Sequence, residues 1–346
     1  MSTKKVYRSA IVGCGGRSAW HARAYKLISR GELVACCDLD TERRQSYAKK
    51  FGIRPYADVV EMIKKEEPDL VHIVTPPNLR VELMRVISDN GVPACIVEKP
   101  IACEVSDWKK LCELEDKTKT KFAVNHQCRW QPDFARCQGA LNSGKLGKLL
   151  FLDFSAGMNI SGQGTHILDY AMSLNQNIPV VRVFGAASGD KEMKAVHPAP
   201  DTTVAQILFA NGVYGMWSNG DTAPRTIDDA AIYKHVRIAA YAERGRILWE
   251  QFCRWEIVSS EAIEAGRIAD MKEWERGDDA AQAGLTSAMF DWLEDDSRPA
   301  GTNLKLSLHQ WNVVLGLYAS SLLRKPVDIP FDPPDDLFLR LAEALQ

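Results

Sequence analysis

The sequence predicts an α/β doubly wound parallel sheet, followed by an α+β part whose large sheet is mostly antiparallel and open on one face. Two observations predict this architecture. Short apolar strands alternate with amphipathic helices over the first 125 residues, and longer alternating segments follow from residue 126 onward. Near-continuous apolar strands with helices between them indicate a parallel sheet covered on both faces. We therefore expect two domains, over residues 1–125 and 126–346.

Strand and helix patterns alternate through the first 125 residues. The predicted strands are 9–12, 33–37, 70–74, 94–97 and 122–124, and the predicted helices are 18–29, 41–51, 58–65, 79–89 and 106–117. Asp40 is placed to cap the second helix, and Gly52 is placed to end it. Right-handed crossovers between such strands give the doubly wound order.

The rest of the chain predicts an antiparallel sheet with helices on one face. A helix pattern at 132–142 precedes alternating segments at 148–157, 180–188, 203–210, 213–219, 234–242, 246–250 and 254–259. Asn211-Gly212 between two of these segments predicts a hairpin. Further helices are predicted near 279–295 and 304–324. The helix near 304–324 is a candidate to pack back on the first domain.

The composition argues against several classes of protein. The net charge is −2, from 43 basic and 45 acidic residues, and no Lys/Arg block occurs, so we expect no nucleic-acid partner. No apolar run approaches the roughly 20 residues of a membrane span, so we expect no membrane partner. The nine cysteines form no Cys-x-x-Cys pair. We expect them to be small buried residues in a reducing, cytoplasmic protein without a metal site.

A glycine-rich turn follows the first strand and reads Gly13-x-Gly15-x-x-Ser18. The first glycine permits a tight turn, the second lets the backbone approach a pyrophosphate, and the small Ser18 permits close packing of helix on strand. The pyrophosphate would meet backbone amides at the start of the helix, at Gly16, Arg17 and Ser18. This pattern, between a strand and a helix, predicts a Rossmann domain that binds a dinucleotide.

An acidic residue, Asp38, ends the second strand 20 residues after Ser18. Its carboxylate can accept hydrogen bonds from both ribose hydroxyls, and it would repel a 2′-phosphate. The predicted coenzyme is therefore NAD, with NADP less favoured. Arg43 and Arg44 keep NADP open as an alternative, although they also fit a solvated helix face.

Further polar groups follow other strands of the first domain. Thr75-Pro76-Pro77-Asn78 can bond the ribose or phosphate of the coenzyme, or it can be a plain connection with Asn78 as a helix cap. Glu98-Lys99-Pro100 follows the strand at 94–97. A lysine beside the nicotinamide and partly out of water has a lowered pKa, so Lys99 can bind a substrate hydroxyl and assist removal of its proton. We expect His21 and His72 to be structural.

A third constellation lies in the second domain, at Gly164-Thr165-His166-x-x-Asp169. Gly164 or Thr165 would cap a helix with His166 in its first turn and Asp169 on the same face. A carboxylate near an imidazole fixes its tautomer and stabilises its charged form. The spacing fits a catalytic histidine, and it also fits a histidine buried at a domain interface.

Together these residues resemble the Gfo/Idh/MocA family, named after glucose–fructose oxidoreductase, inositol dehydrogenase and a rhizopine-catabolism protein. The matching segments are Gly13-x-Gly15, Asp38, Thr75-Pro76-x-Asn78, Glu98-Lys99-Pro100, Asn125-His126-Gln127-x-Arg129-Trp130 and Gly164-Thr165-His166-x-x-Asp169. The resemblance implies an NAD(P)-dependent dehydrogenase that acts on the CH–OH groups of sugars, cyclitols or related polyols. It implies a homodimer or homotetramer, consistent with the open sheet face.

The resemblance also implies residue roles. Lys99, His166 and Asp169 map onto catalytic positions. Glu98 and Gln127 would lie with the coenzyme-binding residues, and the substrate would contact Lys99, His166, Arg129, Trp130, Asn159 and Gln163. The chain departs from the family where an aspartate often precedes the histidine by four positions, because Gly162 stands there. On the resemblance we therefore expect His166 to be the general base, with Lys99 assisting. Arg80 stands near the place where many members have a histidine.

Two other functions stay open on the sequence alone. Some members of this family hold NAD tightly and use it transiently to cleave glycosidic bonds, and the glycine at position 162 keeps this possibility in view. The same fold also serves as a non-catalytic sensor that binds NAD and a partner protein. The presence of both Lys99 and His166 favours an enzyme.

Overall fold

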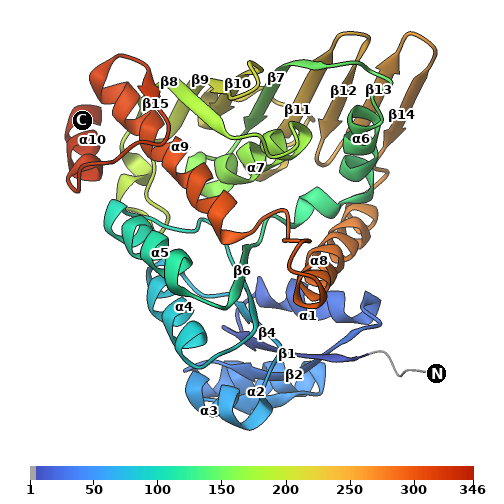
Figure 1. The fold of residues 1–346 in the computed structure, drawn as a ribbon, viewed down its shortest axis with the longest axis vertical. Coiled ribbons are helices and arrows are strands. Elements are labelled where there is room, and N and C mark those ends of the chain that lie inside the picture. The colour runs from blue at the N-terminus through green and yellow to red at the C-terminus, as the bar shows by residue number, and fades with distance from the viewer. Residues whose placement is uncertain (1–4) are drawn as a thin grey trace. The chain divides into compact units, whose positions relative to one another are not determined.

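The computed structural model describes residues 5–346, which form two compact units (Figure 1). The first unit consists of the described part of Met1–Ile101, together with Lys109–Trp130 and Arg276–Lys305. The second unit consists of Ala102–Trp108, Gln131–Glu275 and Leu306–Gln346. No helix within residues 5–346 is long and apolar enough to cross a membrane.

The first unit contains a six-stranded sheet whose neighbouring strands all run parallel. Its strands are β1 Tyr7–Val12, β2 Gly31–Cys37, β3 Arg54–Tyr56, β4 Leu70–Ile73, β5 Ala94–Val97 and β6 Lys121–Val124. Their order across the sheet is β3-β2-β1-β4-β5-β6. This is the Rossmann order, and it confirms the predicted doubly wound sheet. The chain reverses its winding between β1 and β4, and ligands of such sheets bind at the carboxyl ends of the strands beside that point.

Helices follow the strands of this sheet in sequence. They are α1 Ser18–Ala24, α2 Thr41–Phe51, α3 Val59–Glu66, α4 Arg80–Asp89 and α5 Val105–Lys117, and the later α8 spans Met271–Glu294. Asp40 caps α2 through a bond from the Arg43 amide, and Gly52 ends it in the left-handed conformation, as predicted. The chain from α8 joins the core of this unit, where Phe290 stacks on Tyr7 with ring centroids 4.4 Å apart.

The second unit contains a nine-stranded, mostly antiparallel sheet, which confirms the second half of the predicted fold. Its strands are β7 Leu149–Ala156, β8 Val180–Ser188, β9 Thr202–Phe209, β10 Tyr214–Asn219, β11 Val236–Ala242, β12 Gly245–Glu250, β13 Arg254–Ser259, β14 Ile263–Arg267 and β15 Val327–Asp328. Their order is β14-β13-β12-β11-β7-β10-β9-β8-β15, and only the β7–β10 pair among them is parallel. The predicted hairpin joins β9 and β10, with Gly212 at φ +84°.

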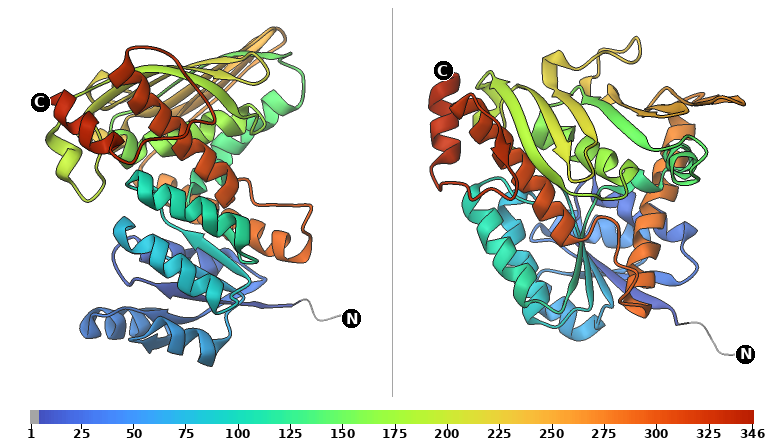
Figure 2. Two further views of the ribbon diagram at one scale, coloured as in Figure 1. Left: turned by 60° about the vertical axis from the view of Figure 1, so that its left-hand side comes forward. Right: turned by 45° about the horizontal axis from the view of Figure 1, so that its top comes forward.

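Helices cover one face of this larger sheet (Figure 2). They are α6 Pro132–Asn142, α7 Thr165–Leu174 and α9 Leu304–Leu323, and a last helix, α10, spans Leu337–Leu345. α7 packs on β7 and β11, and α6 packs on β12 and β13. The close approach of Leu317 in α9 to Gly185 in β8 shows that α9 covers the β8 end of the sheet.

Short helical turns complete the secondary structure. They are the 3-10 turns Tyr25–Leu27, Pro77–Leu79, Gln127–Trp130, Lys191–Lys194, Gly220–Thr222 and Ile232–Lys234, and the π-type turn Ile160–Gly164. Three of these turns contain predicted site residues: Pro77–Leu79 contains Asn78, Gln127–Trp130 contains Arg129, and Ile160–Gly164 contains Gln163.

Candidate active site

The glycine turn after β1 has the geometry of a dinucleotide-binding turn. Gly13 lies at φ +96°, and a Cβ atom there would stand 2.3 Å from the Val74 carbonyl oxygen, so only glycine fits. The space that Cβ atoms on Gly15 and Gly16 would enter is open. The Ser18 hydroxyl donates a hydrogen bond to the Gly15 carbonyl at 2.7 Å. The turn is therefore rigid at its base and open where a pyrophosphate would approach.

Asp38 lies directly beside this turn. Its carboxylate accepts hydrogen bonds from the backbone amides of Cys14 at 2.8 Å and Asp40 at 2.9 Å. Arg43 lies 3.5 Å from the same carboxylate. Because a carboxylate offers about four acceptor sites, Asp38 can hold the turn and still accept from ribose hydroxyls.

The segment Thr75-Pro76-Pro77-Asn78 leads from β4 into α4. Helix α4 begins at Arg80 with Leu79 at its N-cap position, so Asn78 does not cap this helix. Asn78 is exposed, and Thr75 is half-buried with a long 3.4 Å bond to the Pro76 carbonyl. Both side chains lie at the carboxyl end of β4, the edge at which Rossmann sheets bind their ligands.

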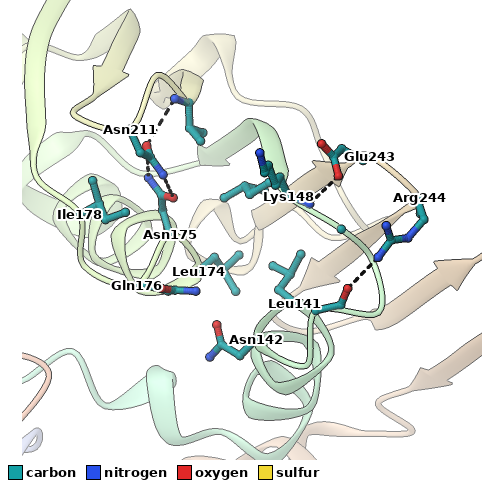
Figure 3. A pocket seen from close by; sticks show the side chains of 14 residues that line it. Leu141, Asn142, Lys148, Leu174, Asn175, Gln176, Ile178, Asn211, Glu243 and Arg244 are labelled. Atoms are coloured by element: carbon teal, nitrogen blue, oxygen red, sulfur yellow. Dashed lines mark hydrogen bonds between the residues drawn. The ribbon is translucent and has the colours of Figure 1, made fainter.

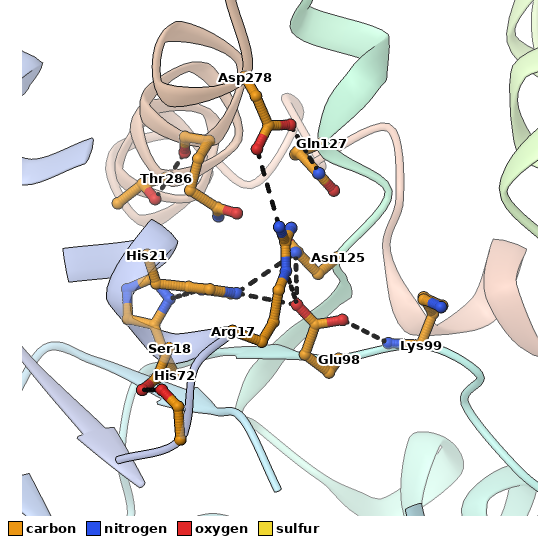
Figure 4. A network of polar contacts seen from close by, with 12 residues as sticks. Arg17, Ser18, His21, His72, Glu98, Lys99, Asn125, Gln127, Asp278 and Thr286 are labelled. Carbon is orange, nitrogen blue, oxygen red and sulfur yellow. Dashed lines mark hydrogen bonds and ion pairs between the residues drawn. The ribbon is translucent and has the colours of Figure 1, made fainter. Parts of the chain in front are cut away.

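Glu98, which follows β5, is the centre of a buried polar network (Figure 4). One carboxylate oxygen, Oε1, accepts three hydrogen bonds: from Arg17 Nε at 2.9 Å, His21 Nε2 at 3.0 Å and Asn125 Nδ2 at 2.8 Å. The other oxygen, Oε2, lies 3.3 Å from the backbone nitrogen of Lys99. Burial raises the pKa of Glu98, but Arg17, His21 and Lys99 together hold it well below its usual range. Glu98 is therefore a buried carboxylate that stays ionised.

The network continues to α8, far along the chain. Asp278 lies 3.7 Å from the Arg17 guanidinium and accepts a hydrogen bond from Gln127 Nε2 at 2.9 Å. Burial raises the pKa of Asp278, and Arg17 opposes that rise. Arg17 therefore lies between two acidic groups, and its side chain is held at the start of α1 beside the glycine turn.

Lys99 is half-buried next to this carboxylate. The pKa of its ammonium group is lowered to about 8, mainly by burial and also by Arg17 and Arg80, whereas Glu98 opposes the shift. Arg80 also donates a hydrogen bond to the Lys99 carbonyl at 2.8 Å. A lysine with this pKa changes its protonation state near neutral pH, whereas an ordinary surface lysine stays protonated there.

Two histidines extend the network on the side of Glu98 away from Lys99. His21 Nδ1 lies 3.0 Å from His72 Nδ1, and His72 Nε2 lies 2.7 Å from the Tyr25 hydroxyl. Both imidazoles are fully buried, and burial lowers the pKa of each. Both therefore have satisfied partners, in line with the structural role predicted for them.

In the second unit, the predicted residues lie on one continuous segment between β7 and α7. Asn159 caps the turn Ile160–Gly164 by accepting a hydrogen bond from the Gly162 amide at 2.8 Å. Gln163 donates to the Tyr233 carbonyl at 2.7 Å. At Gly162 a Cβ atom would approach the Met158 side chain to 2.9 Å. An aspartate at this position would therefore require Met158 to shift.

His166 and Asp169 both lie in α7, as the sequence predicts. Gly164 occupies the N-cap position, and His166 lies in the first turn with its ring 6.1 Å from that of Tyr170. Asp169 is fully buried and accepts a hydrogen bond from Gln310 Nε2 at 2.7 Å. This bond ties α7 to α9 and stabilises the helix that carries His166.

Two further predicted residues, Arg129 and Trp130, follow β6 in the first unit. Arg129 is buried, and its guanidinium lies close to Gly301. Trp130 packs on α8, where a Cβ atom at Gly284 would stand 2.7 Å from its side chain. Both side chains therefore lie against other segments of the first unit.

Comparison with known proteins matches part of the first unit to a family model. Residues 7–126 match the GFO_IDH_MocA model, described as an oxidoreductase family with an NAD-binding Rossmann fold. A D-apiose dehydrogenase of Paraburkholderia graminis is 31% identical over 235 residues, which are 61% of this chain and 62% of that enzyme. Over residues 7–126, the chain therefore matches the NAD-binding Rossmann part of the Gfo/Idh/MocA oxidoreductase family.

Two further proteins are similar to this chain over most of its length. The myo-inositol 2-dehydrogenase of Thermotoga maritima is 23% identical over 257 residues, which are 69% of this chain and 74% of that enzyme. A crystal structure of an oxidoreductase from Agrobacterium radiobacter, in complex with NAD+, L-tartaric acid and magnesium, superimposes with a TM-score of 0.79. It covers 94% of this chain and 99% of its own, at 20% identity.

A cavity of about 710 Å³ in the second unit is distinct from the predicted Gfo/Idh/MocA site residues (Figure 3). It is lined by the ends of α6 and α7 and by loops that include Lys148, Asn211 and Arg244. Leu174 and Asn175, at the end of α7, line it, whereas His166 lies in the first turn of that ten-residue helix. The two positions are about 12 Å apart along the helix axis, so this cavity is not the site of the predicted chemistry.

Sequence reasoning missed two members of the network around Glu98. Asn125 was part of the motif that resembles Gfo/Idh/MocA, but no role was predicted for it, and Asp278 carried no signal at all. A buried aspartate in the middle of α8 reads from sequence as an ordinary polar helix position. The described residues contain no group of three or more His, Cys, Asp or Glu side chains arranged to hold a metal ion.

Proposed function

We propose that this chain is an NAD-dependent dehydrogenase that transfers a hydride between a hydroxyl-bearing carbon of a sugar, cyclitol or related polyol and nicotinamide. One observation carries the proposal. Lys99, with a pKa of about 8, lies beside a buried carboxylate at the ligand-binding edge of a Rossmann sheet. The named activities of the relatives, D-apiose dehydrogenase and myo-inositol 2-dehydrogenase, support this substrate class.

The residues of the first unit fit the coenzyme. The open space at Gly15 and Gly16 fits a pyrophosphate at the start of α1, and Asp38 fits the adenosine ribose. We propose that Thr75, Pro76 and Asn78 contact the coenzyme at the carboxyl end of β4. Arg17, Glu98 and Gln127 would form one side of the coenzyme site. NAD, when bound, supplies the hydride acceptor. Asp38 favours NAD over NADP because a 2′-phosphate would face its charge.

Lys99 handles the proton in this proposal. In the oxidation direction the neutral amine accepts the proton of the substrate hydroxyl and becomes an ammonium, which Glu98 stabilises. In the reduction direction the ammonium returns that proton to the alkoxide oxygen. A pKa of about 8 suits both directions, because neither protonation state of Lys99 is rare near neutral pH.

We propose that His166 shares this task from the second unit, with Asp169 holding α7 in place through Gln310. Arg129, Trp130, Asn159 and Gln163 are the proposed substrate-binding side chains. The short turn that Asn159 caps and Gln163 fixes to the Tyr233 carbonyl is a rigid platform for such contacts.

A homodimer or homotetramer is proposed to form through the face of the larger sheet that carries no helices. Successive residues of a strand alternate between the two faces of a sheet, and residues in register on neighbouring strands share a face. Phe184, Gln206 and Met216 pair across β8, β9 and β10 on the exposed face. Phe184 and Met216 are both exposed there. An apolar patch of this kind is typical of a protein–protein interface.

The test is NAD-linked turnover across inositols, hexoses, sugar acids and glycosides, with NADP as a control. Net NADH formation with a free sugar or polyol supports the proposal, whereas glycoside cleavage without net NADH supports transient redox chemistry instead. Lys99→Ala should lower turnover by about 10²–10⁴-fold with coenzyme affinity unchanged. Lys65→Ala, which removes an exposed lysine of α3, is the matched control and should leave turnover unchanged. An equal loss of NAD affinity in Lys99→Ala would contradict the proton-transfer role.

A further inference from the structure

A continuous chain of hydrogen bonds runs through the core of the first unit from Tyr25 to Glu98. Its three links are Tyr25 hydroxyl to His72 Nε2 at 2.7 Å, His72 Nδ1 to His21 Nδ1 at 3.0 Å, and His21 Nε2 to Glu98 Oε1 at 3.0 Å. Tyr25 lies just after α1 and His72 lies in β4, so different elements supply the links. His21 and His72 are fully buried, so water does not complete their bonding.

The protons of this chain can be assigned from its chemistry. Glu98 is ionised and only accepts, so the proton facing it lies on His21 Nε2. A neutral imidazole has one N–H, so His21 Nδ1 is an acceptor and the proton of the His–His bond lies on His72 Nδ1. His72 Nε2 is then an acceptor, and the Tyr25 hydroxyl donates to it. Every link has one donor and one acceptor.

The one contact that does not follow this pattern is between two donors. Asn125 Nδ2 lies 3.3 Å from His21 Nε2, and both nitrogens donate to the same oxygen of Glu98, at 2.8 Å and 3.0 Å. Two donors that converge on one acceptor necessarily approach each other. The contact is therefore a consequence of the arrangement around Oε1.

We infer that Tyr25 and His72 are positioning residues that lock His21 in the Nε2–H tautomer, so that its N–H holds Glu98 ionised beside Lys99. The inference deepens the proposed function and rests on it, because it assigns a role to two residues remote from the reacting atoms. If each hydrogen bond from Tyr25 to Glu98 ran in the opposite direction, the lone pair of His21 Nε2 would face the carboxylate. That repulsion would favour protonation of Glu98 and would weaken its support for the Lys99 ammonium.

The charged groups around the chain act in consistent directions. Arg17 and Asp278 face His21 together with Glu98, and burial outweighs the two acids in lowering the pKa of His21. His72 faces His21 and Glu98, and burial again dominates in lowering its pKa. Both imidazoles therefore stay neutral across the pH range in which Lys99 titrates, as a tautomer lock requires.

The first experiment reads the tautomers directly and needs no activity. Two-bond ¹H–¹⁵N spectra of the full chain labelled with ¹⁵N-histidine distinguish the two ring nitrogens of its seven histidines, with His21→Gln and His72→Gln used only for assignment. We expect the proton on Nε2 of His21 and on Nδ1 of His72, with neither ring titrating from about pH 6 to 9. A proton on Nδ1 of His21, or an imidazole that titrates in this range, would overturn the inference whether or not the enzyme turns over.

The second experiment removes the lock. Tyr25→Phe deletes the hydroxyl that fixes His72, so we expect a second tautomer of His21 to appear in the spectra. We also expect the ratio of the oxidation rate at pH 9 to that at pH 7 to fall by at least about twofold, because Lys99 would lose part of its support and titrate at lower pH. Tyr7→Phe is the matched control, since it also removes a core tyrosine hydroxyl, bonded to Glu294 at 3.2 Å, away from this chain.

A rescue separates tautomer control from packing. In Tyr25→Phe/His72→Asn, the asparagine Nδ2 can take the place of His72 Nδ1 as the donor to His21, and an amide needs no partner at residue 25 to fix a tautomer. We expect this double variant to restore both the single His21 tautomer and the wild-type pH ratio. An unchanged tautomer and pH ratio in Tyr25→Phe, or a pH shift of the same size in Tyr7→Phe, would overturn the lock.

Discussion

The pH dependence of the proposed oxidation should report the protonation state of Lys99 directly. With a pKa of about 8, about a tenth of the Lys99 side chains are neutral at pH 7 and about nine tenths at pH 9. If the neutral amine accepts the hydroxyl proton, the initial rate of oxidation at saturating NAD should rise about tenfold between these pH values and then level off.

Replacing Glu98 by Gln should move this rise to lower pH. The carboxylate raises the pKa of Lys99, whereas Arg17 and Arg80 lower it, so loss of the negative charge leaves only the lowering effects. More Lys99 is then neutral at pH 7, and the ratio of the rates at pH 9 and pH 7 falls from about ten toward one. The variant should also be less stable by about 3 kcal/mol, because three charge-assisted hydrogen bonds to Oε1 each lose about 1 kcal/mol when they become neutral.

The assay is initial-rate NADH formation from pH 6 to 10 with the best substrate of the panel, since initial rates exclude the effect of pH on the overall equilibrium. Two controls identify the group whose titration causes this rise of the rate with pH (the pH limb). Lys99→Arg keeps a positive charge but cannot lose its proton, so the limb should disappear together with most of the activity. His166→Gln should lower the rate but retain the limb, because Lys99 is still present to titrate. A limb that is absent from the wild type, or that moves to higher pH in Glu98→Gln, would refute the reasoning.

Three further predictions concern the coenzyme, the core and the assembly. Asp38→Ser should raise the preference for NADP relative to NAD by at least about tenfold in kcat/KM, since it removes about 1.4 kcal/mol or more of repulsion and leaves Arg43 in place; an unchanged preference would contradict the role of Asp38. Phe290→Ala should destabilise the protein by about 3–5 kcal/mol in urea unfolding, and a loss below about 1 kcal/mol would show that this core site collapses around the cavity. Met216→Lys should lower the molar mass measured by light scattering while circular dichroism stays unchanged, and Val196→Lys, at another exposed apolar position, should not; equal masses would exclude the open sheet face as the interface.

The elements that the sequence predicts well are those with local signals. Pro132 at the first position of α6, the Asp40 cap of α2 and the Asn211-Gly212 turn each depend on contacts within a few residues. The short strands β3, β14 and β15 were missed. A strand of two to five residues at a sheet edge carries almost no periodic pattern, and its pairing partner decides whether it forms.

The site residues also divide into those with a local sequence signal and those that only the tertiary structure brings together. The glycine turn, Asp38 and Lys99 follow predicted strands, so the rule that ligands bind at the carboxyl ends of parallel strands brings them to one edge. The environment of Lys99 could not be predicted, because it is made by groups from distant segments. Arg17 precedes α1, Asn125 follows β6, and Asp278 lies in α8, and only the tertiary structure brings them around Glu98.

Arg17 gives the sharpest test of how these groups act together. It lowers the pKa of Lys99 directly, and it also keeps Glu98 ionised, which raises that pKa. In Arg17→Met the direct effect is lost in full, whereas Glu98 keeps the hydrogen bonds from His21 and Asn125 and stays ionised. The pKa of Lys99 should therefore rise, and the pH limb of oxidation should move to higher pH, opposite to the shift in Glu98→Gln. If both variants move the limb in the same direction, Arg17 acts on Lys99 mainly through Glu98, and the carboxylate depends on the guanidinium for its charge.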